Sequence, residues 1–297
     1  MGSSSLSQSS SSAVGDRLSS VLLGLYFWEW ITSLGFEWDL ITRKRPLRWP
    51  MFFYLGNRYL LWGHLIDLQL LWIVRGHDHP IDCRVAFALS HLLGKGALAF
   101  ASMNLAIRTI AIWERNIYVI ASLSLVMMAN IAMIFAVAQE SIKTSRWDTE
   151  AMACTTRVNN DWMRIIFLLY MLFDLLVLTL NLQKLGKEIK GRQLRKNLSP
   201  AWDRSKKTTG SERSFMRLTY LVFEQGIVYF FIAVCANAAA LFIVSIPPPN
   251  SNVPLKSFTL PIYVASTIVA CRAVRGLMTF QNNVTDIHVS TSTHLTV

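Results

Sequence analysis

The stretch IYVIASLSLVMMANIAMIFAVA, residues 117–138, decides the fold because it contains no charged side chain. At a rise of 1.5 Å per residue, a helix of this length crosses the hydrocarbon core of a bilayer, which is about 30 Å thick. Residues 117–138 therefore predict a transmembrane helix.

Similar apolar segments lie on both sides of this one, separated by polar links. They cover residues 18–36, 49–74, 84–113, 161–182, 218–244 and 258–275. With residues 117–138 they predict an all-α, polytopic membrane protein, a bundle of seven transmembrane helices within residues 18–275. A Ser-rich, disordered tail is expected at residues 1–17, and a polar tail at residues 276–297.

The composition agrees with apolar surroundings. The chain is 53% hydrophobic and 16% charged, whereas soluble domains carry about 25% charged residues. The net charge of +11 would suggest nucleic acid for a soluble protein. Here the bases are concentrated in the loop 184–217, so the expected partners are the lipid bilayer, its anionic headgroups and a cytosolic signalling protein, not nucleic acid.

The loops also predict an orientation, since Lys and Arg gather on the cytosolic side of a membrane. The turn 43–48, Arg115, the loop 184–217 and the end of the last span fall on one side. The N-terminus is therefore expected outside, and the loop 184–217 and the tail 276–297 in the cytosol. The plasma membrane is favoured over an internal membrane.

Two of the four cysteines are expected on the outer side. Cys83 precedes the third span, and Cys154 lies in the loop after the fourth. A disulfide between them would suit an oxidising compartment. The alternative is two free thiols in the membrane of an intracellular organelle.

Ionisable residues inside the spans are the candidate functional residues, because burying a charge in a bilayer is costly. Depth along the helices allows Lys95, Asp174 and Glu224 to form a buried polar pocket, and Glu29 and Arg58 to form a charge pair. These residues either line a pocket or an ion path, or serve as structural pairs between helices.

Motifs of known chemistries are missing from the sequence. It has no Gly-rich phosphate loop and no nucleophile elbow. The last span has no Lys for a retinal Schiff base, and the His and Asp residues do not gather as metal ligands. We therefore predict neither an enzyme nor a bound cofactor or metal.

Several short motifs resemble a family of uncharacterised fungal membrane proteins, abundant in basidiomycetes and known as domain of unknown function 6533. They are Glu29-Trp30-Ile31-Thr32 followed by Glu37, Asn57-Arg58-Tyr59, the run 108–113, the run 226–230 and Cys271-Arg272. The family usually has an Ile-Trp pair after the position of Glu37, whereas Thr42 follows Ile41 here. The resemblance implies seven membrane helices and no established activity.

The topology of this family is similar to that of G-protein-coupled receptors, including the cysteine pair and an Arg at the inner end of the third helix, which is Arg108 here. The Asp-Arg-Tyr triplet is missing after the third span, and the last span lacks Asn-Pro-x-x-Tyr. We therefore expect a receptor-like sensor, with an outer ligand pocket near Lys95 and Asp174 and a cytosolic coupling surface that includes Arg108. The alternative is a transporter or channel that uses the buried charges as a path.

Overall fold

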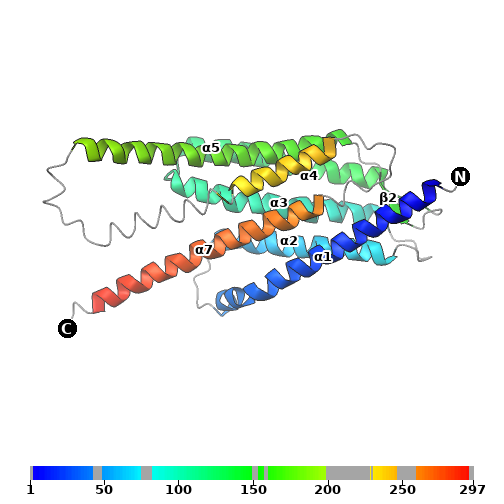
Figure 1. The fold of residues 1–297 in the computed structure, drawn as a ribbon, viewed down its shortest axis with the longest axis horizontal. Helices are drawn as coiled ribbons and strands as arrows, with labels where there is room; N and C mark the ends of the chain where they lie inside the picture. The colour runs from blue at the N-terminus through cyan, green and yellow to red at the C-terminus, as the bar shows by residue number, and fades with distance from the viewer. Residues whose placement is uncertain are drawn as a thin grey trace.

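The computed structural model describes residues 3–42, 49–74, 82–148, 153–156, 160–198, 228, 230–245 and 259–293. Within these ranges the chain folds into seven helices and two short strands. The helices lie along one long axis, with the N-terminus at one end of the molecule and the C-terminus at the other (Figure 1). The predicted all-α class is confirmed.

The helices are α1 (Ser3–Ile41), α2 (Pro50–Val74), α3 (Cys83–Ile112), α4 (Ile117–Thr144), α5 (Asn160–Leu198), the shorter helix Phe230–Ser245 and α7 (Leu260–Thr293). Among the described residues, three helical stretches are long and apolar enough to cross a membrane. These are Cys83–Ile112, Ile117–Thr144 and Asp161–Lys187.

Several helices extend beyond their apolar segments, and α4 continues past residue 138 to Thr144. Helix α1 begins at Ser3 and α7 continues to Thr293, so residues 3–17 and 276–293 are helical where polar tails were expected. Neither extension contains Pro, and Ser or Thr in a helix is less favourable than Ala by well under about 1 kcal/mol per residue. Helix α5 likewise enters the basic loop, of which residues 199–217 lie outside the described ranges.

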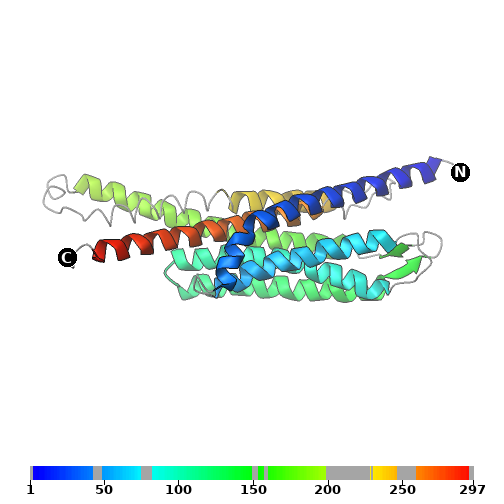
Figure 2. The same cartoon turned by 90° about the horizontal axis from the view of Figure 1, so that it is seen from below.

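A β-hairpin follows α4 at the end of the bundle where the N-terminus of the chain lies (Figure 2). Strand β1 (Arg146–Asp148) pairs antiparallel with β2 (Ala153–Thr155), and Trp147 is opposite Cys154. Cys154 forms a disulfide with Cys83 at the start of α3, with their Cα atoms 5.5 Å apart. The bridge fixes the hairpin to the end of the bundle.

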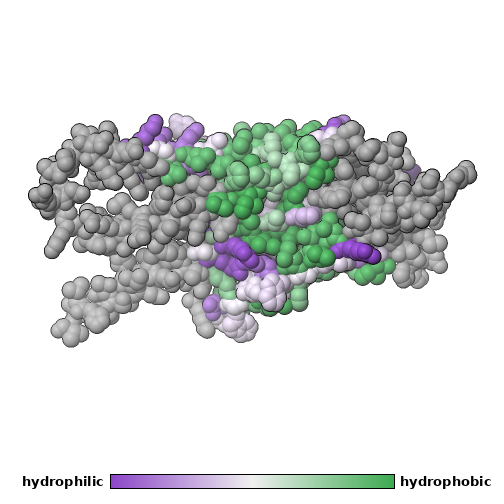
Figure 3. Space-filling view, in the orientation of Figure 1, coloured by the Kyte–Doolittle hydropathy of each residue, from purple (hydrophilic) through white to green (hydrophobic). Residues whose placement is uncertain are grey.

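Polarity is distributed unlike that of a soluble protein. Large apolar side chains face outward along the middle of the bundle, where the space-filling view shows a hydrophobic band with hydrophilic residues at its margins (Figure 3). Trp28 is 67% exposed, Leu125 74% and Phe242 69%. Charged and amide side chains are instead buried between the helices, among them Glu37, Arg58, Lys95, Asp174 and Asn237.

Candidate functional site

A stripe of polar side chains on α1 forms one wall of the candidate site. Tyr26, Glu29, Ser33 and Glu37 recur every three or four residues, which places them on one face of the helix. All four are buried. Because this stripe faces α2 and α7, its carboxylates need partners from those helices.

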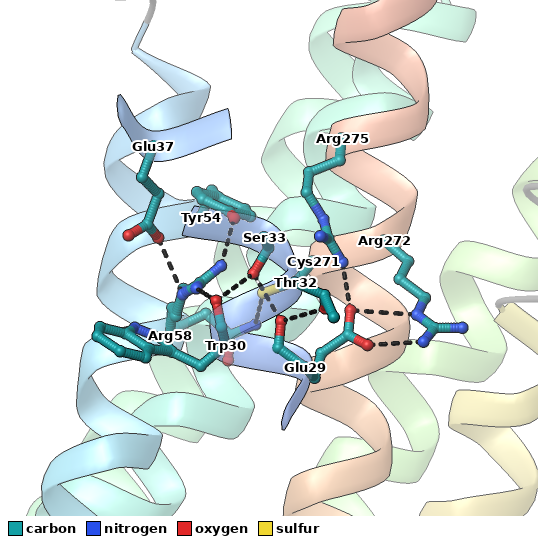
Figure 4. Close-up of polar contacts among 11 residues, drawn as sticks. Glu29, Trp30, Thr32, Ser33, Glu37, Tyr54, Arg58, Cys271, Arg272 and Arg275 are labelled. Carbon is teal, nitrogen blue, oxygen red and sulfur yellow. Dashed lines mark hydrogen bonds and ion pairs between the residues drawn. The ribbon is translucent and has the colours of Figure 1, made fainter. Parts of the chain in front are cut away.

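Arginines from α7 hold Glu29. Nη2 of Arg272 lies 2.6 Å from Oε2 of Glu29, and Nε of Arg272 donates to Oε1 at 3.2 Å. Arg275 also donates to Oε1 (Figure 4). The site therefore joins the first and last helices by charge-assisted contacts, which are stronger than neutral hydrogen bonds.

Arg58 of α2 pairs with Glu37. Their Nε and Oε1 atoms are 2.9 Å apart, aligned as an ion pair rather than as a hydrogen bond. Arg58 also donates to the Tyr54 hydroxyl at 2.8 Å and to the Trp30 carbonyl at 2.7 Å, and Tyr59 donates to Glu37 at 3.2 Å. The guanidinium is thus satisfied from several sides, as a buried charge requires.

Neutral contacts complete the network between α2 and α7. Thr267 donates to Oδ1 of Asn57 at 3.0 Å, and Asn57 donates to Sγ of Cys271 at 3.7 Å. Asn57 and Thr267 are fully buried. We refer to the contacts of Glu29, Glu37, Arg58, Arg272 and Arg275 as the ion-pair network.

A small cavity of about 10 Å³ lies beside the ion-pair network, lined by residues that include Tyr26, Trp30 and Cys271. This is about the space that one water molecule needs. The cavity is therefore too small for an organic ligand.

The structure corrects the predicted pairing of Glu29 with Arg58. Both residues lie in ion pairs, but with other partners, because a helical side chain leans toward the N-terminus of its helix. Arg58 extends one turn back toward Tyr54, and its guanidinium meets Glu37. The α7 arginines reach Glu29 instead.

Lys95 and Asp174 are both buried, but no ion pair between them occurs in the described part of the chain. The Lys95 ammonium lies 3.3 Å from Nδ1 of His91 and 3.5 Å from Sδ of Met163. Met163 precedes Asp174 on α5 by three helical turns, about 16 Å. Lys95 and Asp174 therefore have separate contacts among the described residues. Because Glu224 lies outside these residues, the pocket of Lys95, Asp174 and Glu224 stays a prediction.

Asp174 has neutral partners from two other helices. Its Oδ1 accepts from Ser102 of α3 at 3.4 Å, and its Oδ2 accepts from Asn237 at 2.6 Å. The sequence predicts neither partner, because the cost of burying a charge points to ionisable residues and not to neutral polar ones. An amide inside an apolar span such as residues 218–244 is the signal that identifies Asn237.

Arg108 lies near the C-terminal end of α3 and donates to the backbone carbonyl of Ala273 in α7. It therefore links α3 to the segment of α7 that carries Arg272 and Arg275. Its predicted role in cytosolic coupling stays a prediction.

Within the described residues, no group of three or more His, Cys, Asp or Glu side chains could hold a metal ion. The sequence matches no model of a protein family and none of the curated proteins with which it was compared.

Proposed function

We propose that this chain is an integral membrane protein with seven spans, its N-terminus outside, that acts as a receptor-like sensor of the plasma membrane. Three helices with the length and polarity of membrane spans support the membrane location. So do the outward apolar side chains of α1, α2 and the helix Phe230–Ser245, which include Val21, Phe52 and Phe231. Exposing such a surface to water would be unfavourable.

The basic extension of α5 supports the proposed orientation. Lys184 lies 3.5 Å from Glu114, and the Lys184 and Lys187 ammonium groups lie 6.0 and 5.3 Å from the ring centre of Trp113. Trp next to Lys is typical of a membrane interface. We place the cytosolic headgroups at this level, with the loop 184–217 beyond it.

The proposal also includes membership of the family known as domain of unknown function 6533, which the chain resembles in its short motifs.

The sensor proposal depends on one observation, the contact of Glu29 with two arginines of α7. Arg275 is 19% exposed and Arg272 59% exposed, so the two contacts differ in strength and can break separately. An interface whose ion pairs can break one at a time can serve as a switch between two helix packings. A ligand that binds one packing better would shift the population toward it.

Helix α7 would transmit this change to the cytosol. It continues without interruption from Arg275 to Thr293, about 27 Å further along the axis. A small tilt at Arg275 therefore becomes a larger displacement at Thr293. The extensions of α5 and α7 would form the surface for a cytosolic partner.

Distance measurements can test the switch. Noncanonical residues that carry labels would be placed at the exposed positions Thr42 and Gly276, with the native cysteines kept. The distance between the two labels in nanodiscs then reports the separation of α1 and α7. Glu29→Gln should increase the mean of this distance and broaden its distribution. Asp161→Asn, which removes a carboxylate from an exposed pair with Arg164, should leave it unchanged.

A cytosolic pull-down tests the coupling. The partners of the wild type would be compared with those of Glu29→Gln and of a variant without residues 184–217. If the protein is a sensor, the deletion variant should bind fewer partners, and Glu29→Gln should change the amount of each partner that binds. An unchanged partner set in both variants would leave the ion-pair network a structural feature and refute the sensor proposal.

A transporter or channel is the second candidate, because Asp174 is a buried carboxylate held by neutral groups. Flux into proteoliposomes that disappears in Asp174→Asn would favour this function over a sensor.

A further inference from the structure

The Asp174 carboxylate lies at the junction of α3, α5 and the helix Phe230–Ser245. It is 2% exposed and accepts hydrogen bonds from Ser102 at 3.4 Å and Asn237 at 2.6 Å. Both donors are uncharged, and the Lys95 ammonium turns away toward Met163. A carboxylate in this position is costly to keep ionised without a cation beside it.

A second observation indicates what neutralises this charge. Asn237 is fully buried, and its amide nitrogen donates to Asp174, yet its Oδ1 has no hydrogen-bond partner. A buried acceptor without a donor is unfavourable. Because both atoms belong to one amide group, a half-turn of that group about its Cβ–Cγ bond would bring the unsatisfied oxygen to the Asp174 carboxylate.

Once the Asn237 amide is turned, the atoms that this cluster presents are all oxygens. The Asp174 carboxylate, the Ser102 hydroxyl and the Asn237 carbonyl come from three helices, and the contact shows no thiol or imidazole. Carboxylate, carbonyl and hydroxyl oxygens suit hard cations. One carboxylate balances one positive charge, whereas sites for divalent cations usually combine several carboxylates.

We propose that Asp174, Ser102 and Asn237 bind a sodium ion between α3, α5 and the helix Phe230–Ser245. On binding, the Asn237 amide turns so that its oxygen replaces its nitrogen toward the ion. The ion neutralises Asp174 and connects three helices that are otherwise joined there by two hydrogen bonds. This site requires the chain to be embedded in a membrane but requires neither the sensor nor the transporter function.

Thermal unfolding of the purified full-length protein in nanodiscs tests the site. NaCl is titrated at constant ionic strength against N-methyl-D-glucamine chloride, whose organic cation is much larger than Na⁺. The midpoint temperature should rise with Na⁺ and then saturate. Asp174→Asn should abolish the rise, and Ser102→Ala and Asn237→Ala should each raise the half-saturating Na⁺ concentration by about tenfold or more.

Asp67→Asn is the matched control, because Asp67 is another buried aspartate, on α2 and outside this cluster. It should keep the full response to Na⁺. Should Asp174→Asn not fold, the Ser102 and Asn237 variants decide alone. Equal midpoints in Na⁺ and N-methyl-D-glucamine would overturn the proposal, as would a midpoint that depends on pH and not on Na⁺, since a proton would then neutralise Asp174.

Discussion

Arg58 and Glu37 face each other between α2 and α1, with Nε and Oε1 2.9 Å apart and their side chains 3% and 4% exposed. Removing one partner from a pair this deeply buried costs more stability than the intact pair contributes, because the remaining charge then has no counter-ion. The two residues therefore allow a sharp test of the packing between these helices.

We predict that Arg58→Met lowers the free energy of unfolding by about 3–5 kcal/mol, since Glu37 remains as a buried charge. Glu37→Gln combined with Arg58→Met should recover part of this loss. Unfolding can be followed by the fluorescence of the tryptophans in nanodiscs. Arg164→Met, at an exposed pair, should change stability by less than about 1 kcal/mol. Equal effects at Arg58 and Arg164 would contradict the buried pair.

The two arginines on Glu29 should differ in importance. Arg275 is 19% exposed, whereas Arg272 is 59% exposed and its contact is weakened by solvent or headgroups. Arg275→Ala should destabilise the protein by about 1–3 kcal/mol, and Arg272→Ala by less than about 1 kcal/mol. Unfolding midpoints of both variants, each with and without Glu29→Gln, measure the difference. A larger loss for Arg272→Ala would reverse this ranking.

The sequence predicts which helices exist better than which side chains meet. Apolar length identifies α3, α4 and α5, because a span must have a minimum length and few charges. The cysteine positions also indicate the bridge that joins Cys83 and Cys154. These features depend only on the order of residues along the chain, which can be read directly from the sequence.

Contacts between side chains depend on two further quantities, the rotation of each helix and the direction in which its side chains lean. Depth along the axis places Arg58 near Glu29, but the lean of its side chain carries the guanidinium to Glu37. For the same reason Lys95 meets Met163 instead of Asp174. Neither quantity follows from one sequence.

Gly94 should be needed for the close approach of α3 to α2. A Cβ at Gly94 would lie 2.9–3.1 Å from ring atoms of His64, which is itself buried and 3.3 Å from the Ser90 hydroxyl. Gly94→Ala should therefore lower stability by about 1–3 kcal/mol through overpacking. Gly35→Ala, where nothing lies within 4 Å, should be neutral or stabilising by up to about 1 kcal/mol.

The second change His64→Ala tests the cause of this effect. If the clash destabilises the protein, Gly94→Ala should have little effect in a His64→Ala background, since contacting residues are not additive. An undiminished loss in that background would show that Gly94 is needed for another reason. Unfolding midpoints of the four proteins complete this cycle.

The bridge between Cys83 and Cys154 should stabilise the end of the bundle that carries the β-hairpin, because it joins residues 71 positions apart. A cross-link of this kind contributes about 2–4 kcal/mol, largely by restricting the unfolded chain. Cys83→Ser, Cys154→Ser and the double variant should therefore be equally destabilised, and reductant should lower the midpoint of the wild type but not of these three variants. Cys235→Ser, at an exposed free thiol, should remain as stable as the wild type and equally sensitive to reductant. Additive losses in the double variant would contradict the bridge, because each thiol would then act independently.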